Sequence, residues 1–276
     1  PYRIDEHWGL ELALARKIRA PSYIERYLWI PLEVNAGLGD GNNYIGRVDL
    51  DAEVSHEIEV ALDWRTERAY FAPRAYYRRI DDFIQGEPVV PSPETMPVIG
   101  VSANANGDPT PLQFTNVDAE LYGLDLMASA ELAARLRADA VFSYVRGRRR
   151  DIDDDLFRIA PPSLRLALAW DARRWLAQLE TVLTARQDRI SRRLTDDPAN
   201  PNNSDRETPG YVLLNLRGRV ELAPGLRLNL GIENLLDKTY TDHLSGFNRA
   251  RAGDAPLGQR LPGAGINGRA SLTYDW

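Results

Sequence analysis

The chain of 276 residues has no cysteine, three histidines and two methionines. It therefore has no disulfide framework. The histidines and methionines are widely separated and show no metal-ligand spacing, so we predict no metal site in this chain. A phosphate-binding loop, a nucleophile elbow and a glycine-rich nucleotide motif are also missing from the sequence. We accordingly predict no catalytic residue and no cofactor.

Long apolar runs are also absent. No stretch approaches the roughly 18 apolar residues of a membrane-spanning helix, and the mean hydropathy is −0.40, which excludes a helical membrane protein. A membrane β-barrel is not excluded, because its strands carry apolar residues only at every second position. The net charge of −6 with both signs mixed gives no indication of a nucleic-acid partner.

The most informative stretch, residues 211–240, contains two segments of strict alternation joined by a turn at 223–225. Successive strand side chains point to opposite faces. One face carries Val212, Leu214, Leu216, Gly218, Val220, Leu222, Leu226, Leu228, Leu230 and Ile232. The other carries Asn215, Arg217, Arg219, Glu221, Arg227, Asn229, Gly231 and Glu233. A strand of about ten residues is long enough to cross a bilayer when tilted.

These two strands alone leave two interpretations open. A soluble sheet with one solvated face shows the same alternation. The repeated charges on one face and the nearly pure Leu, Val and Ile on the other favour an outer-membrane barrel, in which charged side chains line a wet lumen.

The rest of the chain shows the same organisation: about ten strands, with four short turns alternating with five long loops. This alternation is typical of outer-membrane barrels, whose turns are short at the periplasm and long outside. We expect the third strand to end at about Ile80, just before Asp81 and Asp82, and residues 148–155 to form a solvated charged loop. The boundary near 130–136 is open, since it fits either a turn or a short helix. Trp170 and Trp175 flank a tight turn and are expected in an interfacial aromatic girdle.

Residues 231–240 resemble the G-x-E-N-L-x-D-K-x-Y signature near the C-terminus of TonB-dependent outer-membrane receptors. The matching residues are Gly231, Glu233, Asn234, Leu235, Asp237, Lys238 and Tyr240. Residues 19–27 are similar to the R-A-P-S-x-x-E-R-Y stretch of these receptors, and residues 50–59 and 116–125 are similar to two further strand segments. The last strand, with Tyr274 and the terminal Trp276, resembles the signal read by the outer-membrane assembly machinery.

The resemblance implies an all-β fold, an antiparallel transmembrane β-barrel. The family's complete barrel has 22 strands around an N-terminal plug domain, and every motif found here belongs to its C-terminal half. We therefore expect residues 1–276 to be the C-terminal portion of such a barrel, without the plug and its energy-coupling box.

The resemblance also implies a function in the bacterial outer membrane. The receptor would bind a metal chelate from outside, either a ferric siderophore, cobalamin or a copper species, and an inner-membrane energy-coupling complex would drive its import through the plug. The lipid bilayer and the assembly machinery are the other implied partners. Our candidate ligand-binding residues lie on the loops and rim: Tyr23, Arg26, Tyr27, Arg79, Arg186, His243, Asn248 and Arg249.

Two alternatives come from other classes of protein. A self-contained ten-stranded outer-membrane protease would place an Asp pair and an Asp-His pair at the barrel mouth, where Asp81, Asp82, Asp242 and His243 are expected. A soluble β-sandwich binding module would show the same alternating strands.

Overall fold

A single antiparallel sheet runs through the computed structural model, which describes residues 2–28, 42–106, 108–195, 205–248, 255–256 and 259–275. Each strand of the main path pairs with the next one in the sequence, and only the short β3 lies off this path, parallel to β6. The strands are β1 (Tyr2–Arg3), β2 (Trp8–Arg19), β3 (Tyr44–Ile45), β4 (Glu53–Arg65), β5 (Ala69–Pro88), β6 (Leu112–Ala133), β7 (Leu136–Arg149), β8 (Ser163–Ala172), β9 (Trp175–Thr184), β10 (Tyr211–Ala223), β11 (Leu226–Glu233) and β12 (Asn267–Tyr274). Ten of these have eight or more residues, which confirms the expected all-β antiparallel wall of about ten strands.

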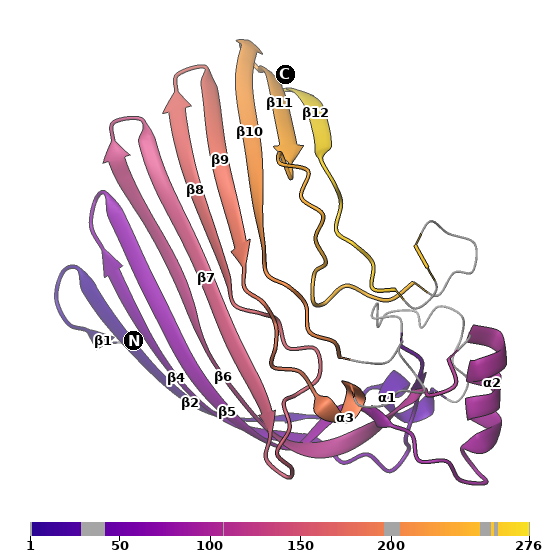
Figure 1. The fold of residues 1–276 in the computed structure, drawn as a ribbon. Coiled ribbons are helices and arrows are strands. Elements are labelled where there is room, and N and C mark those ends of the chain that lie inside the picture. Colours follow the sequence, from indigo (N-terminus) through magenta and orange to yellow (C-terminus); the bar gives the residue numbers. More distant parts are fainter. Residues whose placement is uncertain are drawn as a thin grey trace.

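Figure 1 shows the long strands side by side in a curved sheet, with tight turns at one end and the long connections gathered at the other. The tight turns join β4 to β5, β6 to β7, β8 to β9 and β10 to β11. In the last of these, Gly225 has a φ of +77°, a left-handed conformation that favours glycine. The predicted alternation of short turns and long loops is therefore present in the structure.

The sheet keeps its two faces distinct from strand to strand. On one face the pairing places Leu168 beside Leu179, and Leu179 beside Leu216. These three side chains are each more than 40 % exposed, and within the described residues no second layer of strands or helices packs on this face. We call it the outer face. It has the composition expected of a lipid-facing surface and lacks the covering layer of a sandwich.

The opposite, inner face is charged and hydrogen-bonded. Glu180 is 4 % exposed, and it accepts hydrogen bonds from Asn215 Nδ2 at 2.9 Å and Arg217 Nη2 at 3.2 Å. Arg165 lies 3.7 Å away on β8. The wall therefore satisfies its buried carboxylate with partners from the two neighbouring strands, β8 and β10, as a buried charge requires.

Aromatic side chains lie on the outer face near the turn end. The rings of Trp8 and Trp64 are 6.1 Å apart, and Trp170 and Trp175 are 43 % and 47 % exposed. This is the arrangement expected of an interfacial girdle.

One expected boundary was wrong, and one that was left open is now decided. β5 does not end at Ile80 but continues to Pro88, because residues 83–88 pair with residues 112–117 of β6. Asp82 lies at the register shift between Ile80 and Phe83 with a φ of +60°, so it marks a bulge and not a strand end. Residues 134–135 form a turn, so the short-helix alternative is withdrawn.

Three helices lie in the long connections: α1 (Tyr23–Tyr27), α2 (Met96–Asn106) and α3 (Arg192–Thr195). None of these described helices has the length and hydropathy needed to cross a membrane. The buried apolar clusters also lie at the loop end, where β5 and β6 extend beyond their neighbours. One of them contains Tyr44, Leu50, Ile84, Leu112, Phe114 and Leu194, and the other Ile80, Ala119 and Leu156.

Candidate functional site

The first long loop presents two exposed tyrosines on a capped helical turn. Ser22 and Glu25 form a capping box at the start of α1, in which each side chain pairs with the other residue's backbone N–H. Tyr23 is 78 % and Tyr27 42 % exposed, and their ring centroids are 5.1 Å apart. The loop therefore offers a preformed aromatic pair to the solvent.

The same helix is fixed to the returning chain. Arg26 Nη2 donates to the carbonyl of Leu50 at 2.9 Å. The amide of Gly46 donates to the carbonyl of Leu28 at 2.7 Å. A Cβ atom at Gly46 would lie 2.6 Å from the Leu28 nitrogen, so only glycine fits this approach without a backbone shift.

A buried carboxylate, Glu87, joins three of the loop connections. It pairs with Arg149 at the end of β7 at 2.8 Å and with Arg193 of α3 at 2.5 Å, and it accepts a hydrogen bond from Gln85 Nε2. The side chains of Glu87 and Arg149 are 8 % and 7 % exposed. Arg149, predicted to lie in a solvated charged loop, is thus buried, because the extension of β5 brings Glu87 beside it.

A second chain of contacts continues from α3 to the last loop. Asp154 accepts from Ser191 Oγ and from the backbone N–H of Arg192, both at 2.8 Å, and so caps the start of the short α3. The amide of Ser191 donates to Asp205 at 3.0 Å. Asp205 Oδ1 lies 3.3 Å from His243 Nε2, with both side chains 1 % exposed. The ends of β5 and β7 and the connections that follow β5, β7, β9 and β11 are therefore held together by polar contacts. We call them the loop cluster (residues 85–106, 108–111, 149–162, 185–195, 205–210 and 234–248).

The loop cluster is expected to loosen in acid. The guanidinium of Arg149 donates to Asp151 and holds the pKa of that carboxyl below its usual range. A lowered folded-state pKa means that the stabilisation is present above the ordinary Asp pKa of about 4 and is lost as pH falls through the lowered value. We expect faster hydrogen exchange in residues 149–155 at pH 3 than pH 5 after correction for intrinsic rates. An Asp151→Asn variant should lack this dependence, and an identical acid response in that variant would contradict the assignment.

The structure places the predicted ligand-binding residues in different environments. Arg79 is on the outer face of β5, 3.7 Å from Asp81. Arg186 pairs with Glu207 and is exposed. His243 is buried, and its Nδ1 lies 3.2 Å from Thr208 Oγ1. The side chain of Asn248 donates through Nδ2 to the carbonyl of Ala255 at 2.6 Å. Arg249 lies outside the described residues.

Of the candidates that the structure describes, only the α1 residues are brought together. Tyr23 and Tyr27 form the exposed pair, and Arg26 anchors the helix below them. Ligand contact by any of the candidates stays a prediction.

The signature at residues 231–240 builds the exit from β11. Asn234 has a φ of +51°, and its backbone N–H donates to Asn215 Oδ1 at 2.9 Å. Its side chain donates to the carbonyls of Lys238 and Ala264 and accepts from the Lys238 amide. Asp237 accepts from the amide of Ile266 at 2.9 Å. This asparagine therefore closes a turn and ties it to the chain that enters β12.

The other signature residues also have structural contacts. Glu233 lies 3.5 Å from Arg269, and the amide of Leu235 donates to the carbonyl of Leu214. The Tyr240 ring packs against that of Tyr211 with centroids 4.6 Å apart and planes tilted by 42°. Gly231 lies against the Arg269 side chain. Tyr274 is 58 % exposed on β12, and Trp276 lies outside the described residues.

The geometry at Asp81, Asp82, Asp242 and His243 does not form a peptidase site. Asp81 is paired with Arg150 at 2.8 Å, and Asp242 accepts from Tyr211 Oη at 3.0 Å. His243 is 2 % exposed and contacts Asp205 and Thr208. Within the described part of the chain, no three His, Asp or Glu side chains are grouped to hold a metal ion.

Sequence reasoning missed Glu87, Asp154 and Asp205, which organise the loop cluster. Their partners are 37 to 62 residues away for the Glu87–Arg149, Asp154–Ser191 and Asp205–His243 pairs, and no local pattern signals such contacts. The capping box of α1 was also missed, although Ser22 and Glu25 have the local spacing that starts a helix.

The comparisons with known proteins agree with this architecture. A family model described as "TonB dependent receptor-like, beta-barrel" matches residues 2–235. Among solved structures, the copper transporter OprC is similar with a TM-score of 0.77 at 22% identity, over 98% of this chain and 37% of that chain. The FrpB iron transporter from Neisseria meningitidis has a TM-score of 0.66 at 15% identity, over 99% of this chain and 37% of that one.

A mutant of the ferric enterobactin receptor PfeA from Pseudomonas aeruginosa has a TM-score of 0.64 at 18% identity, over 99% of this chain and 38% of that one. The chain thus spans a little over a third of the length of these proteins. The search among curated proteins gave no match.

Proposed function

The chain belongs to the TonB-dependent receptor β-barrel family of the bacterial outer membrane, and from this premise we propose that the receptor it forms imports a metal chelate. The family match over residues 2–235 is the observation that carries the proposal. The cargo is a ferric siderophore, cobalamin or a copper species. An inner-membrane energy-coupling complex drives its passage through a plug domain.

Family membership also decides between the alternatives. The protease interpretation is withdrawn, because the chain belongs to a receptor family and the charged pairs that suggested hydrolysis are engaged in structural contacts. The soluble sandwich is withdrawn because the described apolar face carries no second layer.

The architecture supports a division of labour within the receptor. The charged inner face lines the water-filled lumen. The loop cluster provides a scaffold of loops, bonded to one another, at the extracellular end. The described parts of these loops are tied to one another through Glu87, Asp154 and Asp205. They therefore lose little conformational entropy when a ligand binds, which favours affinity. The aromatic pair of α1 is the best-presented contact surface for a planar or aromatic chelator.

The ligand class is testable by direct uptake. We expect cells whose only receptor for the chelate is the full-length protein to accumulate one of the three cargo classes, and to lose uptake when the inner-membrane proton gradient is collapsed. Binding does not need this energy, so the purified receptor should still bind the chelate in the absence of the coupling complex. Uptake that is unaffected by loss of the gradient would overturn the active-transport proposal.

The aromatic pair gives a second, residue-level test. We expect Tyr23→Ala with Tyr27→Ala to weaken binding of the identified chelate by about tenfold, the effect of losing about 1.4 kcal/mol from an aromatic contact. Tyr2→Ala is the matched control, since Tyr2 is 70 % exposed at the turn end of the sheet. Equal affinities for the double variant and the control would remove α1 from the binding surface.

A further inference from the structure

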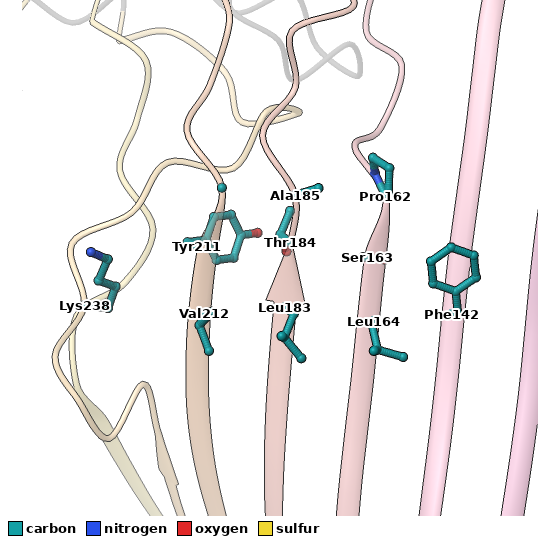
Figure 2. A pocket seen from close by; sticks show the side chains of 11 residues that line it. Phe142, Pro162, Ser163, Leu164, Leu183, Thr184, Ala185, Tyr211, Val212 and Lys238 are labelled. Carbon is teal, nitrogen blue, oxygen red and sulfur yellow. The ribbon is translucent and has the colours of Figure 1, made fainter.

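An apolar hollow lies on the outer face close to the loop end, with a volume of about 670 Å³. Figure 2 shows its lower row of side chains, one from each of four adjacent strands, and Lys238 at the β10 end of the row. That row is Phe142, Leu164, Leu183 and Val212, which pair in register across β7, β8, β9 and β10.

The hollow exists because the next positions toward the loops carry small residues. Pro162, Ala185 and Gly210 stand two residues beyond Leu164, Leu183 and Val212. A Cβ atom on Gly210 would lie 2.8 Å from the carbonyl oxygen of Thr184, so the site has no room for a side chain there without a shift. The wall is consequently recessed at the level where the lipid-facing band ends.

A smaller, basic hollow of about 130 Å³ lies directly beyond it and shares Pro162 with it. Three arginines, Arg146, Arg186 and Arg189, line this second hollow together with one acidic residue, Asp188. Arg189 Nη1 donates to Tyr144 Oη at 2.9 Å. Arg146 lies 3.5 Å from Asp155, and Arg186 pairs with Glu207.

The order of side chains along β7 follows the polarity gradient of a lipid. Phe142 faces the apolar hollow, Tyr144 stands at the boundary, and Arg146 lines the basic hollow. From Phe142 to Arg146 the strand advances four residues, or about 13 Å. An acyl chain, a polar linkage and a phosphate occur in the same order in a membrane lipid. Arginine is also the side chain best suited to phosphate, through its forked donors.

We propose that the two hollows form one binding site for a phosphorylated, acylated lipid of the outer leaflet. Its acyl chain lies on the row of Phe142, Leu164, Leu183 and Val212. Its phosphate is bound by Arg186 and Arg189, with Arg146 behind them and Lys238 at the far side of the apolar hollow. Continuity with the lipid-facing band and the three arginines that line the basic hollow select this occupant over a protein segment. The site lies on the outer face, outside the lumen, and Arg186 is the one residue it shares with the candidates for cargo binding.

Native mass spectrometry of the full-length, delipidated receptor in detergent tests the proposal. The probes are diphosphoryl lipid A, the same lipid after removal of both phosphates, and inorganic phosphate. We expect one diphosphoryl lipid A per receptor, bound about tenfold or more tighter than the dephosphorylated form, as one charge-assisted contact implies. Inorganic phosphate should not displace it, because it cannot use the apolar hollow.

Two variants address the two halves of the site. Arg186→Gln with Arg189→Gln should weaken lipid A binding about tenfold, and Ala185→Trp should do the same by filling the apolar hollow. The matched controls are Arg16→Gln and Ala75→Trp, which lie on the outer face of β2 and β5 away from both hollows; both should bind as the parent does. Folding is checked by the heat-dependent gel mobility of the barrel.

Three results would overturn the proposal: equal binding of the phosphorylated and dephosphorylated lipids, displacement by inorganic phosphate, or a control that weakens binding as much as its partner variant. If Ala185→Trp fails to fold, the variant Arg186→Gln with Arg189→Gln still tests the proposal. Both arginine side chains are exposed, so their replacement removes no core contact.

Discussion

Glu87→Gln is expected to destabilise the loop cluster by about 3 kcal/mol, the lower end of the cost of leaving one partner of a buried ion pair uncompensated. The lower end applies because Arg149 keeps Asp151 as a second partner, and that side chain is 38 % exposed. Arg193 contributes little to the loss, since it is 51 % exposed and water can replace its partner. The cost therefore arises almost entirely at the buried Arg149.

Hydrogen exchange of the full-length receptor measures this effect locally. We expect faster exchange in residues 149–155 and in α3, and unchanged exchange in β8–β10, which do not touch Glu87. Glu94→Gln is the matched control, because Glu94 lies in the same connection and accepts a hydrogen bond from the neighbouring Ser92. The combined Glu87→Leu and Arg149→Met replacement should recover much of the protection, since an apolar pair of similar volume removes both buried charges.

Unchanged exchange in Glu87→Gln would mean that the loops are held by their apolar clusters alone. The competing contribution is substantial, because Leu194 of α3 is 2 % exposed within the cluster that contains Ile84 and Leu112. The single Glu87→Gln replacement separates the two contributions, because the double replacement should leave exchange near the parental rate in either case.

The wall of this protein was predictable from the sequence because its signal is local. Each strand carries its own period-two pattern, so Leu214 and Leu216 reveal the outer face of β10 without knowledge of any neighbour. The alternation of turn and loop lengths gave the sidedness in the same way. The signature around Asn234 was recognised as a family feature, but its physical role, closing a turn at positive φ, is evident only from its contacts.

The loop end was not predictable because its structure depends on distant partners. Asp81 and Asp82 were interpreted as a strand end, because residues 76–84 resemble the Y-x-R-x-I-D-D-x-I tail of a receptor strand. The strand continues because residues 112–117 pair with it and absorb the irregularity as a bulge at Asp82. Once β5 extends, Glu87 comes beside Arg149, and a segment expected to be solvated becomes buried. One missed long-range pairing therefore accounts for both errors.

Two neighbouring residues of β8 give the sharpest test of whether the outer face contacts lipid. Leu166 lies on the outer face between Ala140 and Thr181, and Ala167 lies on the inner face between Asp139 and Glu180. We expect Leu166→Arg to cost about 2–4 kcal/mol of folding free energy in a bilayer, the penalty for arginine near the midplane of a barrel's lipid face. Ala167→Arg should cost little, because the new guanidinium meets two carboxylates and lumen water.

Urea titration of the full-length receptor folded into phosphatidylcholine vesicles measures both changes as shifts of the unfolding midpoint. The two substitutions introduce the same side chain one residue apart, so strand propensity and the denatured chain are nearly matched, and the difference between them isolates the medium that each face contacts. A large loss for Leu166→Arg with a small one for Ala167→Arg requires hydrocarbon on the leucine side. Equal losses of folding free energy would mean that both faces contact the same medium. The outer face would then not lie in the membrane, and the proposed lipid site on it would be ruled out.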